Sequence, residues 1–301
     1  MSYAAIILIL FSTVLHATWN MFSRKFRASS SSFCIGGLSV CLLLLPLNIY
    51  YFDALPNIDN QSLSIVALSS VFQALYFYGV VNAYKYGNLS LSYPLLRSIP
   101  ILIVLFYAII FGDSKSISIE LVAGGVLIII GCIFLPMRHL KDFSVANYAN
   151  KMILFVLLAA LGTAGYSILD STGMQTLAAA SPESHLFLVS ATYIYLQILF
   201  TSLMLGVISI ASNQGRQEFI DVLKSKKAFS FAISTMTMLS YAPILVAMTL
   251  VTNVTYVVAF RQASIPIAFL FGIMFLKEAS YNIRWIAIMF IIIGLVTSAL
   301  F

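Results

Sequence analysis

The chain has 301 residues, of which 61% are hydrophobic and only 9% are charged, and its net charge is +6. Its mean hydropathy is +1.01. Soluble domains carry about 25% charged residues, so this composition excludes a water-soluble globular protein and predicts an all-α integral membrane protein. The three cysteines lie within apolar runs and indicate neither a disulfide framework nor a metal site.

Ten segments are long and apolar enough to span a bilayer, which takes about 20 residues. The first lacks the basic start and the small-residue cleavage site of a signal peptide, so we expect it to be a span. None of the ten alternates polar and apolar residues, which favours helices over the strands of a barrel. The predicted spans are approximately 3–23, 33–52, 63–84, 89–111, 118–136, 152–172, 186–210, 228–250, 254–276 and 283–301.

Lysine and arginine are distributed unequally among the connecting loops. Thirteen lie in loops that follow odd-numbered spans, one lies in a loop that follows an even-numbered span, and two, Arg97 and Arg261, lie within spans. Because cytoplasmic loops are enriched in Lys and Arg, we predict that both termini lie outside the cytoplasm. The net positive charge is a topology signal and gives no indication of nucleic-acid binding.

The two halves of the chain resemble each other. Residues 83–101 (AYKYGNLSLSYPLLRSIPI) align with residues 247–265 (AMTLVTNVTYVVAFRQASI), which matches Arg97 with Arg261. Two shorter stretches also align, IIIG at 128–131 with IIIG at 291–294, and HATWN at 16–20 with TAGYS at 163–167. Each half contains five spans, an odd number, so the second half must be inverted in the membrane.

The predicted fold is therefore ten transmembrane helices arranged as two inverted five-helix repeats, residues 1–137 and 138–301. Inverted repeats with a site near the bilayer midplane are typical of secondary transporters. A site built between the halves would bring the two matched arginines close to the centre of the protein.

Four stretches carry a family resemblance: NAYKYGNLSLSYPLLRSIPILIVLFYAIIFGD, AMTLVTNVTYVVAFRQASIPIAFLFGIMFLKE, LHATWNMFSRK and YSILDSTG. They resemble the EamA-type branch of the drug/metabolite transporter superfamily over essentially the whole chain. The resemblance implies a ten-helix carrier with a central cavity, most often an inner-membrane exporter of metabolites. Asp113 stands where the family more often has Glu. Many members are expected to have cytoplasmic termini, whereas the charges here predict the opposite.

Arg97 and Arg261 lie inside predicted spans, where a charge is costly. One interpretation is that each side chain snorkels toward the headgroups or forms a structural pair. The other is that both face a cavity and bind an anion, because the planar guanidinium fork suits carboxylate and phosphate oxygens. Prolines near both arginines, Pro100 and Pro266, loosen the helical backbone and favour the second interpretation.

Asp170, in YSILDSTG, is the one carboxylate that the sequence places well within a span, near the external end of the sixth. Arg261 enters the membrane from the same side, so the two side chains are expected to meet. The pair would be structural, since buried charges seek partners, or Asp170 would be the proton-coupling residue.

Six further residues have polar or aromatic side chains and are candidates for substrate contact: His16, Trp19, Asn20, Gln73, Tyr76 and Tyr166. The first three fall on one helical face that is poorly suited to lipid. The alternative for His16 is a hydrogen-bonded core histidine, and most of the aromatic residues in the chain are expected to be packing or interfacial residues.

The chain has no HExxH, GxSxG or P-loop motif and no Cys/His cluster. We therefore expect no enzymatic activity, no cofactor, no metal and no direct use of ATP. The predicted function is secondary transport, with export of a small anionic or zwitterionic metabolite such as an amino acid across the inner (plasma) membrane. A phosphate- or phosphonate-bearing cargo and efflux of lipophilic compounds are the alternatives, and a channel or a scaffold is also left open.

The expected partners are the small-molecule substrate and the lipid bilayer, with no nucleic acid. A homodimer is left open. A lipophilic cation would call for a glutamate deep within a span, and no glutamate lies at such a position.

Overall fold

The computed structural model describes residues 3–50, 56, 58–86, 89–111, 118–135, 137–139, 151–276 and 279–299. All regular secondary structure within these ranges is helical. Asp113 and Glu278, the acidic residues that follow the fourth and ninth predicted spans, lie outside the described residues.

Each of the ten predicted segments coincides with helical structure. The helices are α1 (Tyr3–Lys25), α2 (Ser30–Tyr50), α3 (Asn60–Tyr86), α4 (Leu89–Phe111), α5 (Ile119–Phe134), α6 (Lys151–Ala180), α7 (Leu186–Ile210), α9 (Lys227–Thr249), α10 (Val254–Phe260) with α11 (Ser264–Leu276), and α12 (Asn282–Ala299). One more helix, α8 (Asn213–Ser225), occupies the loop between the seventh and eighth segments, where only an interfacial turn was expected.

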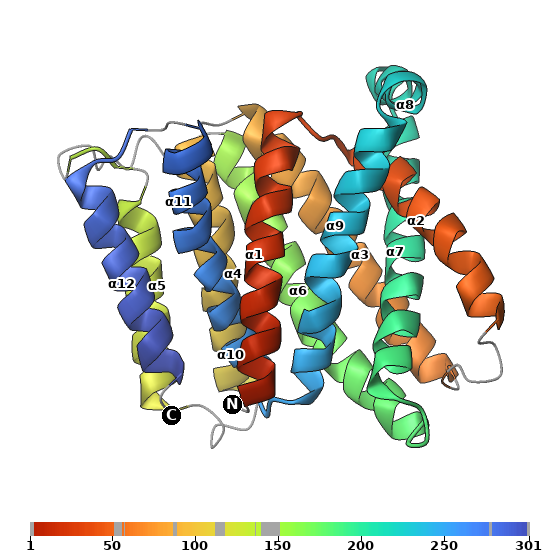
Figure 1. Cartoon of the computed structure of the whole chain (residues 1–301), viewed down its shortest axis with the longest axis horizontal. Coiled ribbons are helices and arrows are strands. Elements are labelled where there is room, and N and C mark those ends of the chain that lie inside the picture. The colour runs from red at the N-terminus through yellow and green to blue at the C-terminus, as the bar shows by residue number, and fades with distance from the viewer. Residues whose placement is uncertain are drawn as a thin grey trace.

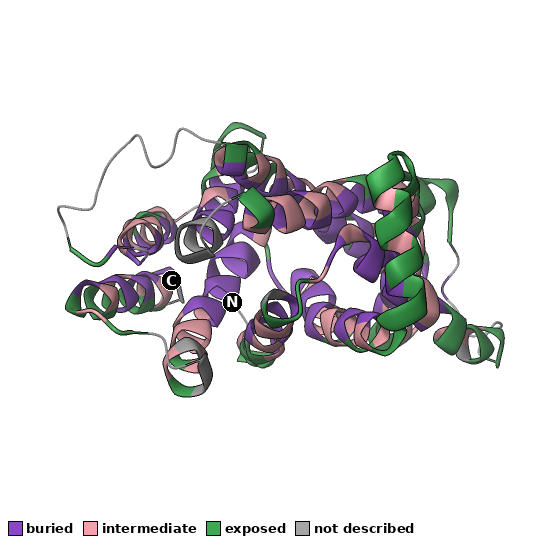
Figure 2. Cartoon of the chain, turned by 90° about the horizontal axis from the view of Figure 1, so that it is seen from above, coloured by how far each residue is buried: buried purple, intermediate pink, exposed green. Residues whose placement is uncertain are grey.

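The structure describes a multi-pass membrane protein. Seven of its described helical segments are long and apolar enough to cross a membrane, and three shorter apolar helices cover Leu95–Phe111, Ile119–Phe134 and Asn282–Ser298. Large apolar side chains are exposed on the outer helix faces, as expected for surfaces in contact with lipid, whereas buried residues face inward (Figure 2). Ten crossings therefore stay a prediction at the three shorter helices.

Apart from α8, which lies across the end of the bundle, and with α10 and α11 taken as one segment, successive helices run in alternating directions along one axis (Figure 1). Both termini lie at one end of this axis and α8 lies at the other end, so α8 and the termini are on opposite sides of the molecule. The pair α5 and α12 forms one edge, and α2 with α7 forms the other. Between these edges α3 packs along α6, and α1 packs along α9.

Glycine permits the closest helix contacts, as small residues do in membrane bundles. A Cβ atom added at Gly162 would lie 2.6 Å from the backbone oxygen of Phe72, so α6 and α3 touch through their backbones. A Cβ added at Gly124 would lie 2.5 Å from the backbone oxygen of Gly294, which joins α5 to α12 in the same way. The first contact lies in the central part of the molecule, and the second holds together the pair of helices at one edge.

The ninth predicted segment is not one continuous helix. Helix α10 has seven residues, begins at the cap Asn253, and ends where a 3₁₀ turn, η5 (Arg261–Ala263), connects it to α11. Short 3₁₀ stretches within a helix often mark functional positions. Arg261 therefore lies at the interruption itself, with its side chain 5% exposed.

Candidate functional site

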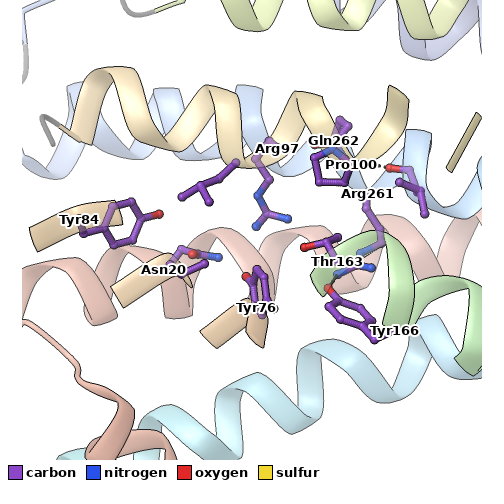
Figure 3. Close-up of a pocket in the computed structure, with 12 residues that line it drawn as sticks. Asn20, Tyr76, Tyr84, Arg97, Pro100, Thr163, Tyr166, Arg261 and Gln262 are labelled. Carbon is purple, nitrogen blue, oxygen red and sulfur yellow. Dashed lines mark hydrogen bonds between the residues drawn. The ribbon is translucent and has the colours of Figure 1, made fainter. Parts of the chain in front are cut away.

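Arg97 of α4 and Arg261 of η5 line one narrow cavity in the middle of the protein (Figure 3). About 410 Å³ of space, including the open part at its mouth, lies between the lining side chains. Among the described residues that line it, none carries a carboxylate. The lining residues come from α1, α3, α4, α6, α10 and η5: Asn20, Tyr76, Val80, Tyr84, Leu96, Arg97, Pro100, Thr163, Tyr166, Val258, Arg261 and Gln262.

Arg261 is held by two residues of α6. Its Nη2 donates a hydrogen bond to the hydroxyl of Tyr166 at 3.0 Å, and its Nη1 is 3.5 Å from the hydroxyl of Ser167. The guanidinium carbon lies 5.7 Å from the ring centroid of Tyr166 and 5.4 Å from that of Tyr241, both within the range of cation–π attraction. These contacts fix the plane of the guanidinium at the cavity wall.

Arg97 is also buried, with 9% of its side chain exposed. Figure 3 shows its guanidinium reaching from α4 into the cavity toward Tyr76. A snorkelling arginine would extend to a headgroup region, whereas this side chain shares an interior cavity with Arg261. The cavity therefore has two permanent positive charges in its wall.

The predicted face of α1 lies beside this cavity. Asn20 is part of the lining, and its side-chain amide donates to the backbone oxygen of His16 at 2.8 Å. The rings of His16 and Trp19 meet edge to face with centroids 5.2 Å apart, and both residues are buried. The imidazole Nδ1 of His16 and the indole nitrogen of Trp19 have no hydrogen-bond partner within the described part of the chain.

Asp170 of α6 is fully buried, and its carboxylate accepts hydrogen bonds from three other helices. Ser69 of α3 and Tyr241 of α9 donate through their hydroxyls. From α7, the Tyr193 hydroxyl donates at 2.9 Å, and Gln197 Nε2 lies 2.8 Å from each carboxylate oxygen. Helix α6 continues to Ala180, so Asp170 lies about 15 Å before its end at 1.5 Å per residue. Asp170 therefore lies further from the end of its helix than the predicted span indicated, and its depth in the membrane stays a prediction.

The predicted direct pairing of Asp170 with Arg261 was also wrong. No ion pair joins them among the described side chains, because Tyr241 lies between them. The Tyr241 hydroxyl donates to Asp170 while its ring lies under the Arg261 guanidinium. The ring also meets Tyr166 edge to face at 5.7 Å. Asp170 and Arg261 are therefore connected through one tyrosine side chain rather than through a shared hydrogen bond.

Of the residues chosen from the sequence, the structure brings Arg97, Arg261, Asn20, Tyr76 and Tyr166 to the same cavity. Gln73 does not line it. Its amide oxygen instead accepts from Thr201 Oγ1 at 2.9 Å, in a different part of the bundle.

The sequence reasoning did not find the donors that surround Asp170. A usable signal was present, because Tyr193 and Gln197 are four residues apart on one face of a strongly apolar segment, as are Ser69 and Gln73. In the described residues no group of three or more His, Cys, Asp or Glu side chains is placed to hold a metal ion.

Residues 3–137 match the model of the EamA-like transporter family. A search of curated proteins finds no match. Among 28 matching chains of solved structures, one crystal structure covers 100% of this chain and 99% of its own, with 16% sequence identity and a TM-score of 0.65. At that identity the likeness shows the fold alone.

Proposed function

We propose that this chain, whose residues 3–137 match the EamA-like transporter family, is a transporter of the drug/metabolite transporter superfamily and exports a small anionic or zwitterionic metabolite, with an amino acid as the first candidate. The family consists of membrane transporters rather than enzymes. The observation that carries the proposed cargo is the position of Arg97 and Arg261 in the wall of one buried cavity.

The charge of the cavity favours an anion. A guanidinium stays protonated in a protein, so neither arginine can neutralise itself as its surroundings become less polar. Two like charges facing one narrow space repel each other. An anion between them is attracted to both, and these two attractions offset the repulsion. The hydroxyl of Tyr166 and the amide of Asn20 add polar contacts, while Tyr76 and Val258 provide apolar surface for the rest of the molecule.

The proposed architecture is a pair of inverted repeats, residues 1–137 and 138–301. Reciprocal contacts support it. A Cβ added at Gly131 would lie 2.6 Å from Ile291 Cγ1, and a Cβ added at Gly294 would lie 2.9 Å from Ile128 Cγ1. The repeated IIIG motif matches Gly131 with Gly294 and Ile128 with Ile291, so the two contacts exchange partners, as a local two-fold axis requires.

Asp170 is the proposed proton-coupling residue. It is a buried carboxylate with no direct ion-pair partner in the described structure, and its contact with the anion site runs through Tyr241. Protonation of Asp170 would weaken it as the acceptor that holds Tyr241, and Tyr241 contacts Arg261. This gives a route by which protonation at one position changes the cavity at another. Uptake of a proton from outside would then drive cargo outward.

The cargo is tested with purified protein and with vesicles. Thermal stabilisation is measured with panels of amino acids, other small carboxylates, alkylphosphonates and lipophilic cations. We expect stabilisation by anions or zwitterions, loss of most of it in Arg97→Gln, and a weaker loss in Arg97→Lys, which keeps the charge without the planar fork. Arg216→Gln is the matched control, because Arg216 is exposed on α8.

The direction is tested by adding a radiolabelled form of the best stabilising anion to a suspension of inside-out membrane vesicles. Export predicts accumulation in these vesicles when their lumen is acidic. Stabilisation by lipophilic cations alone, or unchanged anion binding in both Arg97 variants, would contradict the proposed cargo.

A further inference from the structure

A second cavity lies between α2, α3, α7 and α9, in a different part of the bundle from the arginine cavity. About 420 Å³ of space, including its open part, lies between its walls. None of the described residues that line it is Lys, Arg, His, Asp or Glu. Its chemistry is therefore that of an uncharged site, in contrast to the two guanidinium groups of the first cavity.

One wall of this cavity presents an unsatisfied acceptor. Gln197 is fully buried, and its Nε2 donates to both oxygens of Asp170 at 2.8 Å and to Ser69 Oγ at 3.0 Å. The carboxylate offers only acceptors when ionised, so it fixes which end of the amide faces it. The amide oxygen must then point away from Asp170, and it accepts no hydrogen bond from any described residue.

A second unsatisfied group lines the same cavity from α9. The hydroxyl of Ser234 is buried and has no hydrogen-bond partner within the described ranges. Buried polar atoms are normally satisfied, and leaving one unsatisfied costs stability. Two residues with such atoms line one space, which indicates a place where a polar group of another molecule is accommodated.

Much of the remaining wall is aromatic and aliphatic. The rings of Phe33 and Phe77 are stacked with centroids 4.4 Å apart, and both side chains are buried. Met238, whose flexible thioether adapts to different shapes, also lines the space. These surfaces suit a flat apolar body, and apolar walls with a few placed polar groups are typical of small-molecule sites.

We propose that this cavity is a second ligand site, which binds an uncharged molecule with an aromatic or apolar body and one O–H or N–H donor. The donor bonds to the amide oxygen of Gln197, and the body packs on Phe33 and Phe77. This site is separate from the anion site of the proposed function and does not depend on it. Tyr241 lines this cavity and also contacts Arg261, which lines the other cavity, so one side chain lies between this cavity and Arg261.

Trp19 provides a reporter, because its ring centroid is 6.2 Å from that of Phe33. The chain has one other tryptophan, Trp285, which is 46% exposed on α12, so Trp285→Phe leaves Trp19 as the single indole. Binding is measured as the fluorescence change of this variant in detergent and in nanodiscs. The probes are benzyl alcohol and benzyl methyl ether, which share an aromatic body but differ in the O–H donor.

We expect a saturable change with benzyl alcohol and roughly five- to tenfold weaker binding of the ether, the size of effect that one neutral hydrogen bond gives. The ether partitions more strongly into lipid, so a nonspecific membrane effect would give the reverse order. Equal responses to the two probes would overturn the proposal.

A second experiment fills the cavity with a larger side chain. Thr237 lines it, and the Thr237 hydroxyl bonds only within its own helix, to the backbone oxygen of Ile233. Thr237→Phe should abolish the response to benzyl alcohol. Thr235→Phe is the matched control, because Thr235 makes the same kind of bond to Phe231 and does not line the cavity.

Ile198→Phe fills the same space from α7 and replaces Thr237→Phe if that variant does not fold. Arg97→Gln should leave the response to benzyl alcohol unchanged, so the proposal for this cavity and the proposal for the anion site are tested separately. An undiminished response in both filled variants would overturn the proposal, and so would competition between benzyl alcohol and the stabilising anion.

Discussion

At the scale of single residues, Tyr241 connects two buried charged groups, the Asp170 carboxylate and the Arg261 guanidinium. Its hydroxyl is one of the donors to the Asp170 carboxylate, and its ring is one of two that flank the Arg261 guanidinium. A tyrosine can hold these two positions at once because its polar end and its aromatic face are different parts of one rigid side chain.

Tyr241→Phe keeps the ring and removes the hydroxyl. The buried Asp170 carboxylate then loses one donor, so we expect the free energy of unfolding to fall by about 1–3 kcal/mol. Anion-induced stabilisation should persist, because the ring under Arg261 remains, while the pH dependence of transport should weaken. Tyr195→Phe is the control, since Tyr195 lies on the same helix as Tyr193 and does not bond to Asp170. An unaltered pH profile in Tyr241→Phe would contradict the connection.

Asp170→Asn removes the charge and keeps the shape. It should abolish proton-driven accumulation in vesicles and leave cargo binding to purified protein detectable, because Asp170 does not line the arginine cavity. Counterflow exchange of labelled for unlabelled cargo, which needs no proton gradient, should survive. Normal pH-driven transport by this variant would show that Asp170 is only a structural residue.

At the scale of elements, the helices were predicted from the sequence, whereas the interruption of the ninth segment at Arg261 was not. Runs of apolar residues about 20 long identify helices such as α7, whose bounds Leu186–Ile210 match the predicted segment. The turn at Arg261 was not predicted, because the polar residues Gln262 and Ser264 and the nearby Pro266 do not fix where a helix breaks. Helix α8 was missed because it is short and polar, and helix formation there depends on its Ser212 cap and on local packing.

The candidate site was predictable only in part, for a related reason. Arg97 and Arg261 are conspicuous because charges are rare within spans. The donors around Asp170 are Ser, Tyr and Gln, residue types that also occur in ordinary packing, so only the three-dimensional contacts show that four helices converge on one carboxylate.

Two adjacent glycines of α5 give a test of helix packing. A Cβ at Gly124 would lie 2.1 Å from Ser298 Oγ and 2.5 Å from the Gly294 backbone oxygen, whereas a Cβ at Gly125 would meet nothing closer than Ile101 Cγ2 at 3.6 Å. Gly124→Ala should therefore separate α5 from α12 and lower stability by roughly 1–3 kcal/mol, the usual cost of overpacking.

Gly125→Ala should be neutral or stabilise the protein by up to about 1 kcal/mol, because alanine favours the helix. Thermal unfolding of the two variants in one detergent makes the comparison. Equal melting temperatures would contradict the close α5–α12 contact.

At the scale of the whole molecule, the charge distribution predicts the orientation. Helix α8 lies at the opposite end of the structure from both termini (Figure 1). Cysteine introduced at the exposed positions Gln217, on α8, and Glu183, between α6 and α7, should therefore report on opposite sides of the membrane. The native cysteines are buried and should give little background labelling.

In intact cells, an impermeant thiol reagent should label Glu183→Cys and not Gln217→Cys. The reverse pattern would place the termini in the cytoplasm. If both positions were labelled only after the membrane is permeabilised, both would lie in the cytoplasm. That result would fit neither orientation and would contradict the predicted span between Glu183 and Gln217.

The Asp170 cluster has no counterpart in the first half, although one of its donors, Ser69, comes from that half. In the alignment of the halves, Tyr241 corresponds to Phe77, and Asp170 corresponds to Ser23, so the first half has neither the carboxylate nor its tyrosine donor. A carrier made of two identical inverted halves would spend equal time open to each side when empty. We predict that the hydrogen bonds of this cluster favour one orientation at rest, so the half-saturating cargo concentration should differ between the two faces of the membrane.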